Sequence, residues 1–194
     1  MHTITGDVHR TAVRATVALV DRVTAADLNR PTPCAGWDLA DLLAHLTAQH
    51  RGFAAAVRGH GRDPAVWEPA RPGKDFRERY AEAAAVVVEA FAAPGALDRE
   101  VDLPELSTER TFPARLALLF HLVDYVVHGW DVAAALSLPF ELPDEVVATA
   151  LPIARAVPGG ESRLIPGAAF APARPVPPGT GPLREILLLL GRQP

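Results

Sequence analysis

The chain has 194 residues, about half of them apolar, so it can bury a sizeable core and is not expected to be disordered. Nineteen basic and twenty-three acidic residues give a formal net charge of −4, which disfavours a nucleic-acid-binding surface. A single cysteine, Cys34, excludes an internal disulfide, and the sequence has neither a signal-type apolar run nor a stretch of ~18 consecutive apolar residues. These totals predict a cytoplasmic protein, monomeric or homodimeric, that binds neither nucleic acid nor a membrane.

Apolar residues recur at helical spacing through most of the chain, as Val13, Val17 and Val20 illustrate. The predicted helices cover about 8–23, 39–58, 75–93, 113–136, 143–156 and 183–190. Residues 96–112 are predicted to form a short strand or an irregular crossover. A Pro- and Gly-rich linker follows over 157–182, with a short extended piece expected around Phe170.

Strand signals are poor, so the predicted fold class is all-α. The architecture is a four-helix bundle with additional short helices and a Pro/Gly-rich C-terminal extension. Residues 1–156 are assigned to the bundle. Residues 157–194 are assigned to a wrapping segment and a short helix of the same domain.

The second helix has a clear start signal. Asp38 is placed as its N-cap, and Asp41 stands where a capping box would have Glu. Trp37 and Trp130 each precede an aspartate and are expected to pack in the core. Pro152 is expected to kink or shorten the fifth helix.

The fourth helix carries the residues with the most chemistry. Asp124 and His128 are four residues apart, so they project from one face about one turn apart and can reach a single ion. A buried Asp–His ion pair without a metal fits the same spacing equally well. His121 lies on this face too, and three roles are open for it: a fourth ligand, a hydrogen-bond donor that orients Asp124, or a residue at the boundary of the core without a role in the site. The orienting role is preferred.

The third ligand must come from another helix. His45 is the best candidate because it borders the core face of the second helix, although a boundary histidine without a ligand role is common there. His2, His9, His50 and His60 are expected to face solvent or lie at termini. Two roles are open for Asp131: it caps a helix or pairs with an arginine, or, three residues after His128, it accepts a hydrogen bond from that ring. Cys34 is expected to be a packed, inert thiol.

Two motifs together resemble a known family. Two stretches are similar to the metal motifs of the mycothiol-dependent maleylpyruvate isomerase N-terminal domain family. They are Thr32-Pro33-Cys34-Ala35-Gly36-Trp37-Asp38 through His45-Leu46, and Asp124-Tyr125-Val126-Val127-His128-Gly129-Trp130-Asp131. That family belongs to the DinB/YfiT-like superfamily. The C-terminal segment from Gly181 to Arg192 is similar to the end of an actinobacterial subfamily, so the resemblance covers nearly the whole chain.

The resemblance implies a four-helix bundle whose divalent metal is bound by His45, Asp124 and His128, with open positions for other ligands. The isomerase carries Glu where this chain has Asp124, and it has a separate C-terminal domain that this chain is expected to lack. The implied metal is zinc, with nickel as the alternative. The implied cosubstrate is a mycothiol-type thiol.

The resulting functional hypothesis is a metal-dependent thiol transferase or isomerase acting on a small electrophile. In it, His121 or Asp131 tunes a ligand and loop residues around Trp67 shape the pocket. The alternatives are a metal-dependent hydrolase, a non-catalytic metal- or small-ligand-binding bundle, and a bundle whose metal site has decayed.

Overall fold

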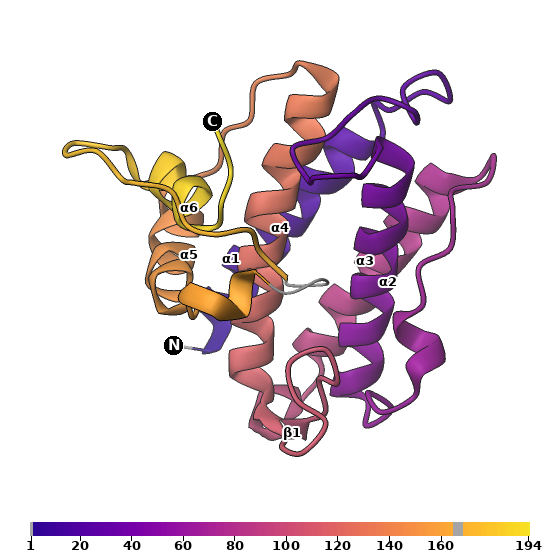
Figure 1. The fold of residues 1–194 in the computed structure, drawn as a ribbon. Helices are drawn as coiled ribbons and strands as arrows, with labels where there is room; N and C mark the ends of the chain where they lie inside the picture. The colour runs from indigo at the N-terminus through magenta and orange to yellow at the C-terminus, as the bar shows by residue number, and fades with distance from the viewer. Residues whose placement is uncertain (1, 165–168) are drawn as a thin grey trace.

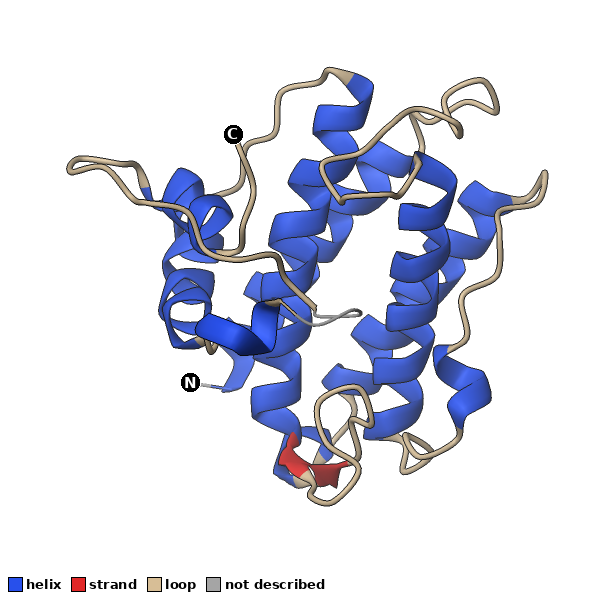
Figure 2. Ribbon diagram, viewed as in Figure 1, coloured by secondary structure: helices blue, strands red, loops and turns tan. Residues whose placement is uncertain are grey.

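The computed structural model describes the backbone of residues 2–164 and 169–194, and it is dominated by helices (Figures 1 and 2). Four long helices form the bundle: α1 (His2–Val20), α2 (Leu39–Val57), α3 (Phe76–Ala92) and α4 (Ala114–Leu136). Each contacts two of the others, in the cyclic order α1, α3, α2, α4. The predicted all-α class and bundle architecture are therefore confirmed.

The start of α2 is fixed by the predicted capping box. Asp38 accepts a hydrogen bond from the Asp41 backbone N–H at 2.8 Å, and the Asp41 carboxylate accepts one from the Asp38 N–H at 3.3 Å. Arg71 then bridges the two carboxylates, at 2.9 Å from Asp38 and 2.8 Å from Asp41. Because this end of α2 is held so firmly, the position of His45 two turns later is well defined.

Smaller elements close one end of the bundle, where they share a hydrophobic cluster. The region predicted as a strand or a crossover is an antiparallel hairpin of β1 (Glu100–Val101) and β2 (Phe112–Pro113), preceded by a 3₁₀ turn, η2 (Ala96–Asp98). Another 3₁₀ turn, η1 (Pro64–Trp67), places the Trp67 ring against Gly52 of α2. A Cβ on Gly52 would lie 2.1 Å from that ring, so the packing requires glycine at this position.

The C-terminal part of the chain packs on one side of the bundle. Helix α5 (Asp144–Ala156) contacts α1 and α4, and α6 (Pro182–Leu189) contacts α5. Pro152 lies inside α5 without ending it. A third 3₁₀ turn, η3 (Gly160–Arg163), lies between them, and the Arg163 guanidinium donates to the Pro158, Ala171 and Leu189 carbonyls. A short extended piece was expected around Phe170, and the described residues there form no β-strand.

Helix α4 is the most apolar element. It is long and apolar enough to cross a membrane by length and composition, but 72% of its apolar window is buried inside the bundle. Its neighbours α1, α2 and α5 cover it. These contacts account for its composition, because a helix that is apolar on most sides is expected at the centre of a bundle.

The core contains a chain of three histidines that was not predicted. His9 of α1 and His50 of α2, expected at the surface, are 1% and 0% exposed. The Nε2 atom of His9 lies 2.9 Å from Nδ1 of His121, and the Nε2 atom of His121 lies 3.2 Å from Nδ1 of His50. No sequence pattern singles out His9 or His50 as buried, but hydrogen bonding between imidazoles makes their burial possible. His60 is exposed as expected, and the side chain of His2 lies outside the described part.

Burial keeps all three imidazoles neutral. Desolvation and nearby Arg10 lower the pKa of His9 to about 4. Desolvation, and after it electrostatic repulsion from the neighbouring histidines, lowers the pKa of His50 and of His121 well below 6.5. The unfolded chain therefore takes up protons at pH values where the folded protein does not.

This difference predicts an acid-sensitive fold. Histidines with a depressed pKa favour unfolding as the pH falls from about 6.5 towards the folded value, so stability is lost in that window. For His9 alone, the free energy of unfolding should fall by about 2 kcal/mol between pH 7 and pH 5, as urea denaturation can measure. The exposed-site variant His60→Phe should retain this dependence and His121→Phe should reduce it. A wild-type stability that is flat from pH 7 to pH 5 would contradict neutral burial.

Candidate metal centre

Helices α2 and α4 bring the three predicted ligands together. One ligand atom of each of His45, Asp124 and His128 lies within 4.8 Å of the others. The Nε2 atom of His128 is 3.4 Å from Oδ1 of Asp124, and the rings of His45 and His128 are 5.2 Å apart, edge to face. Zinc ligands lie about 2 Å from the ion, so donor atoms this close can share one ion.

The surroundings of Asp124 suit a cation. Its Oδ2 atom is buried without a hydrogen-bond partner in the described part of the chain. An unpartnered buried carboxylate oxygen is expensive, and a divalent ion would satisfy it. The whole side chain still has 19% of its surface exposed, so solvent reaches the group. The residues present therefore fit a metal ion bound by two imidazoles and one carboxylate.

The two histidines of the centre have opposite protonation preferences. Burial lowers the pKa of His45 to about 4, so its ring is neutral at pH 7 and has a free lone pair. Burial also disfavours charge on His128, but the Asp124 carboxylate and the hydrogen bonds to Asp124 and Asp131 outweigh it and raise the pKa of His128 well above 6.5. The protein without a metal therefore has a buried Asp124–His128 ion pair, and a metal must displace the proton on Nε2 of His128.

Asp131 fixes the other side of the His128 ring, which is one of the two roles that the sequence left open for it. Its Oδ2 atom lies 2.9 Å from Nδ1 of His128. The pKa of Asp131 is lowered to about 2, because hydrogen bonds from His128 and Arg192 outweigh the effect of complete burial. An imidazole that donates Nδ1–H to a carboxylate has Nε2 available for a metal, which is the usual arrangement around histidine ligands.

Arg192 completes this support from the far end of the chain. Its Nη2 donates to Oδ2 of Asp131 at 2.7 Å and its Nε donates to Oδ1 at 3.1 Å. The residue is 6% exposed, so this is a buried, bidentate ion pair. Sequence reasoning missed it, because a lone arginine in the last turn of a chain has no spacing relationship to a residue 61 positions earlier.

Cys34 lies against the same group. Its Sγ atom is 3.3 Å from Oδ2 of Asp131, 3.8 Å from Nδ1 of His128 and 3.4 Å from Nη2 of Arg192. Cys34, His128 and Asp131 form a second set whose ligand atoms lie within 4.8 Å of one another. A cation there would compete with the Arg192 guanidinium for Asp131, so the set containing His45 and Asp124 is the better metal site.

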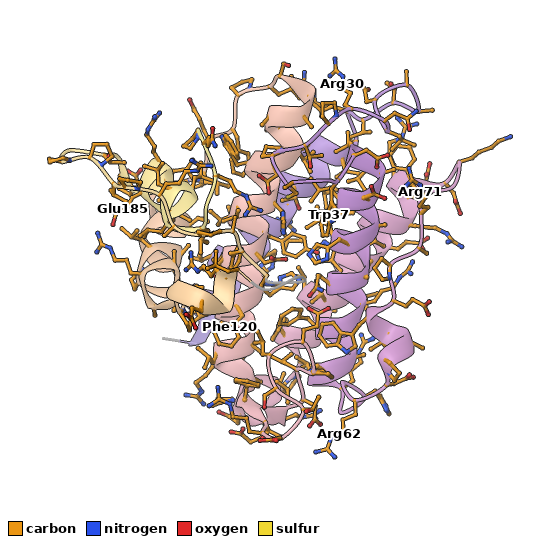
Figure 3. The ribbon with its side chains drawn as sticks, in the orientation of Figure 1. Arg30, Trp37, Arg62, Arg71, Phe120 and Glu185 are labelled. Atoms are coloured by element: carbon orange, nitrogen blue, oxygen red, sulfur yellow. The ribbon has the colours of Figure 1, made fainter. Side chains whose placement is uncertain are left out.

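Two expectations about the surroundings of the centre are wrong. His121 does not orient Asp124, because its two ring nitrogens face His9 and His50. Trp37, labelled in Figure 3, is not a core residue, because it is 37% exposed. Its ring lies 5.0 Å from that of His45. Trp67 instead packs in the core against Phe53.

The loop around Trp67 does line a cleft, but at another place. The cleft has a volume of about 630 Å³ and is lined mainly by α2 and the loop that follows it, including Arg51, Arg58, Arg62 and Val66. None of the three candidate ligands lines it. The expectation that this loop shapes the metal site is therefore not supported.

A carboxylate that the sequence did not single out lies on the α2 side of the centre. Gln49, one turn beyond His45, donates from Nε2 to both carboxylate oxygens of Glu105 at 3.0 Å. Burial, and then the negative charge of Asp124, raise the pKa of Glu105 against the opposing effect of Gln49. Glu105 lies in the hairpin loop, where no periodicity relates it to the helices.

Comparisons with known proteins show the family of the chain. Residues 9–133 match the family model described as the mycothiol maleylpyruvate isomerase N-terminal domain. Two uncharacterized proteins from two strains of Mycobacterium tuberculosis are 33% identical over 184 residues, covering 95% of this chain and 95% of each relative.

Solved structures share the fold at low sequence identity. A crystal structure of the mycothiol-dependent maleylpyruvate isomerase has a TM-score of 0.57 and 18% identity, and that of a mutant has a TM-score of 0.60 and 14% identity. Each comparison covers 77% of this chain and 67% of the isomerase chain. From the family match and the relatives together, the chain belongs to the mycothiol maleylpyruvate isomerase N-terminal domain family, within the DinB-like superfamily.

Proposed function

We propose that His45, Asp124 and His128 bind one divalent metal ion, zinc in preference to nickel, and that the protein is a metal-dependent thiol transferase or isomerase. The observation that carries this proposal is the convergence of the three ligand atoms around an unpartnered carboxylate oxygen. Membership of a mycothiol-related isomerase family favours a mycothiol-type thiol as cosubstrate over water, and hence transfer or isomerisation over hydrolysis.

A zinc ion at this centre would lower the pKa of a bound thiol and so supply a nucleophile at neutral pH. The chain's own residues would prepare the site for this chemistry. Neutral His45 offers a lone pair without first losing a proton. Asp131 and Arg192 hold His128 with its Nδ1 occupied, which leaves Nε2 for the ion. The Trp37 ring lies beside His45, with the two ring centroids 5.0 Å apart, and would form one wall of the site.

The remaining proposals concern the protein as a whole. We propose that it acts in the cytoplasm on a small electrophile, as a monomer or a homodimer. We also propose that residues 157–194 belong to the same domain as the bundle. The contact of Arg192 with Asp131 supports this, because it ties the last turn of the chain to α4.

Metal content is the first prediction. Wild-type protein purified without a histidine tag should contain about one equivalent of divalent metal, measured by elemental analysis, because three ligands converge on one position. His128→Ala should lose it, whereas His60→Ala, at an exposed histidine, should not. Wild-type protein that stays metal-free after incubation with zinc or nickel would refute the proposed site.

Zinc binding should release a proton. The raised pKa of His128 means that its ring is protonated at pH 7 in the metal-free protein, and the ion must displace that proton. Calorimetric titration in buffers of different ionisation enthalpy should show about one proton released per zinc. The affinity should fall about tenfold per pH unit below the pKa of His128. Zinc binding at pH 7 without proton release would mean that His128 is not a ligand.

The Asp131–Arg192 pair should control affinity without touching the ion. Asp131→Asn removes the charge that holds the His128 ring, and it should weaken zinc binding by roughly 10- to 100-fold. Arg192→Leu should act in the same direction, because it leaves Asp131 buried without its partner. Arg184→Leu, at an exposed arginine near the same end of the chain, is the matched control. Equal zinc affinities in wild type and the three variants would show that the Asp131–Arg192 pair does not influence zinc binding.

Catalysis is tested by thiol transfer. Zinc-loaded wild-type protein should accelerate the addition or transfer of mycothiol to small electrophiles, including the isomerisation of maleylpyruvate, and His45→Ala should lose most of that rate. A thiol lacking the mycothiol sugar serves as the comparison for cosubstrate recognition. Equal rates for wild type and His45→Ala would favour the non-catalytic metal-binding alternative.

A further inference from the structure

Two buried side-chain atoms in the described residues have no hydrogen-bond partner, and they lie on facing helices. One is Oδ2 of Asp124 on α4 and the other is Nε2 of His50 on α2. His121 relates them: it is bonded to His50, and it lies three residues before Asp124 on the same face of α4. The Asp124 carboxylate also acts on His50 electrostatically, because it raises the pKa of that ring against the larger, opposing effect of burial, so the two groups lie near each other.

The His50 ring is held in one orientation. It stacks on Tyr125 with centroids 4.1 Å apart and meets Tyr80 edge to face at 5.1 Å. Its Nδ1 atom is engaged by His121, so Nε2 must point away from the histidine chain. A ring flip would break that bond without satisfying both nitrogens. The unpartnered nitrogen is therefore a built feature of the core.

Hydrogen bonding along the histidine chain links the tautomers of the His9, His121 and His50 rings. Each ring is neutral at pH 7, so each carries one N–H. When His9 donates from Nε2 to His121, His121 must donate from Nε2 to His50. His50 Nδ1 is then the acceptor, and its single proton is on Nε2. The negative charge of Asp124 favours this direction, because it places a donor on the unpartnered nitrogen of a ring that this charge influences.

We propose that His50 donates its Nε2–H to an anionic atom of the ligand bound at the metal centre, a thiolate sulfur or an oxyanion, and that His121 and His9 hold it in that tautomer. This inference rests on the proposed metal site, because an anion is accepted beside Asp124 only when a cation balances the charge. His50 is then a ligand-contacting residue, whereas His121 and His9 are positioning residues. The binding class is a small anion, and recognition takes place in a nearly dry interior where a charged hydrogen bond is strong.

The first test needs neither a metal nor a substrate. Long-range ¹H–¹⁵N correlation spectra of ¹⁵N-histidine-labelled, metal-free protein at pH 7.5 distinguish the two imidazole tautomers. His9, His121 and His50 should all be protonated on Nε2 and not on Nδ1. In His121→Phe, where a ring of similar shape removes the donor, His50 should show both tautomers. A wild-type His50 protonated on Nδ1 would overturn the proposal, and this result does not depend on whether zinc binds.

The second test measures anion binding directly. Cobalt(II)-loaded protein is titrated with 2-mercaptoethanol, and the thiolate-to-cobalt absorption band reports binding. His50→Phe should bind the thiolate about tenfold more weakly than wild type, the loss expected for one hydrogen bond to a charged group, while its cobalt affinity is retained. His60→Phe should match wild type. Equal thiolate affinity in wild type and His50→Phe would overturn the assignment.

The two tests separate the possible failures. Wild-type protein that binds no cobalt would refute the proposed function, and the tautomer spectra would still decide the orientation of His50. If His50→Phe does not fold, His121→Phe replaces it in the thiolate titration. If His121→Phe binds the thiolate as tightly as wild type does, and its His50 shows a single tautomer, then His121 and His9 do not position His50.

Discussion

The placement of one imidazole between two carboxylates, Asp131 buried and Asp124 partly exposed, is the constraint on which the candidate centre depends. His128 faces Asp124 through Nε2 and Asp131 through Nδ1. Arg192 supplies the second positive charge, so the four side chains are electrically balanced when His128 is protonated. Removing any one of them would leave an uncompensated buried charge, which is far more costly than losing a surface pair. A divalent ion that replaced the His128 proton would leave a net positive charge, which favours an anionic ligand.

The charge balance among Asp124, His128, Asp131 and Arg192 also explains why the C-terminal segment is attached to the bundle. Arg192 reaches Asp131 because α6 packs on α5, which in turn packs on α4. Arg163 reinforces this path by donating to the Leu189 carbonyl at the end of α6. Packing of the C-terminal segment and the electrostatics of the candidate centre are therefore coupled. The histidine chain ends in the core of the bundle at His50, whose pKa is influenced by the charge of Asp124.

Much of this arrangement could be predicted from local patterns. Helical periodicity located the long helices, and the Asp38–Asp41 capping box marked where α2 begins. The spacing of Asp124 and His128 predicted which face of α4 is polar. For Asp131 it left open a bond to the His128 ring or a pairing with an arginine, and the structure has both. Joining His45 to this face required the resemblance of both motifs, because spacing along one helix does not specify the facing helix. The metal itself remains a proposal.

The errors concern contacts between residues far apart in the sequence. His9 and His50 were expected at the surface because a lone histidine is usually found there, yet each is buried by hydrogen bonding through His121. Arg192 and Glu105 lie in segments without periodicity, so their partners depend on how loops pack. Trp37 was expected in the core, but its loop holds it beside His45 with 37% of its surface exposed. In each case tertiary packing decides the environment, and no local pattern encodes it.

The ligand set of the metal is the central claim, and X-ray absorption at the zinc edge tests it most directly. Zinc-loaded wild-type protein without added thiol should show two imidazole nitrogens and carboxylate oxygen at about 2.0–2.2 Å, and no sulfur. Adding a small thiol should introduce one sulfur at about 2.3 Å. A sulfur ligand before any thiol is added would place the ion at Cys34, Asp131 and His128 and contradict the account. A shell of water oxygens without imidazole would contradict it equally.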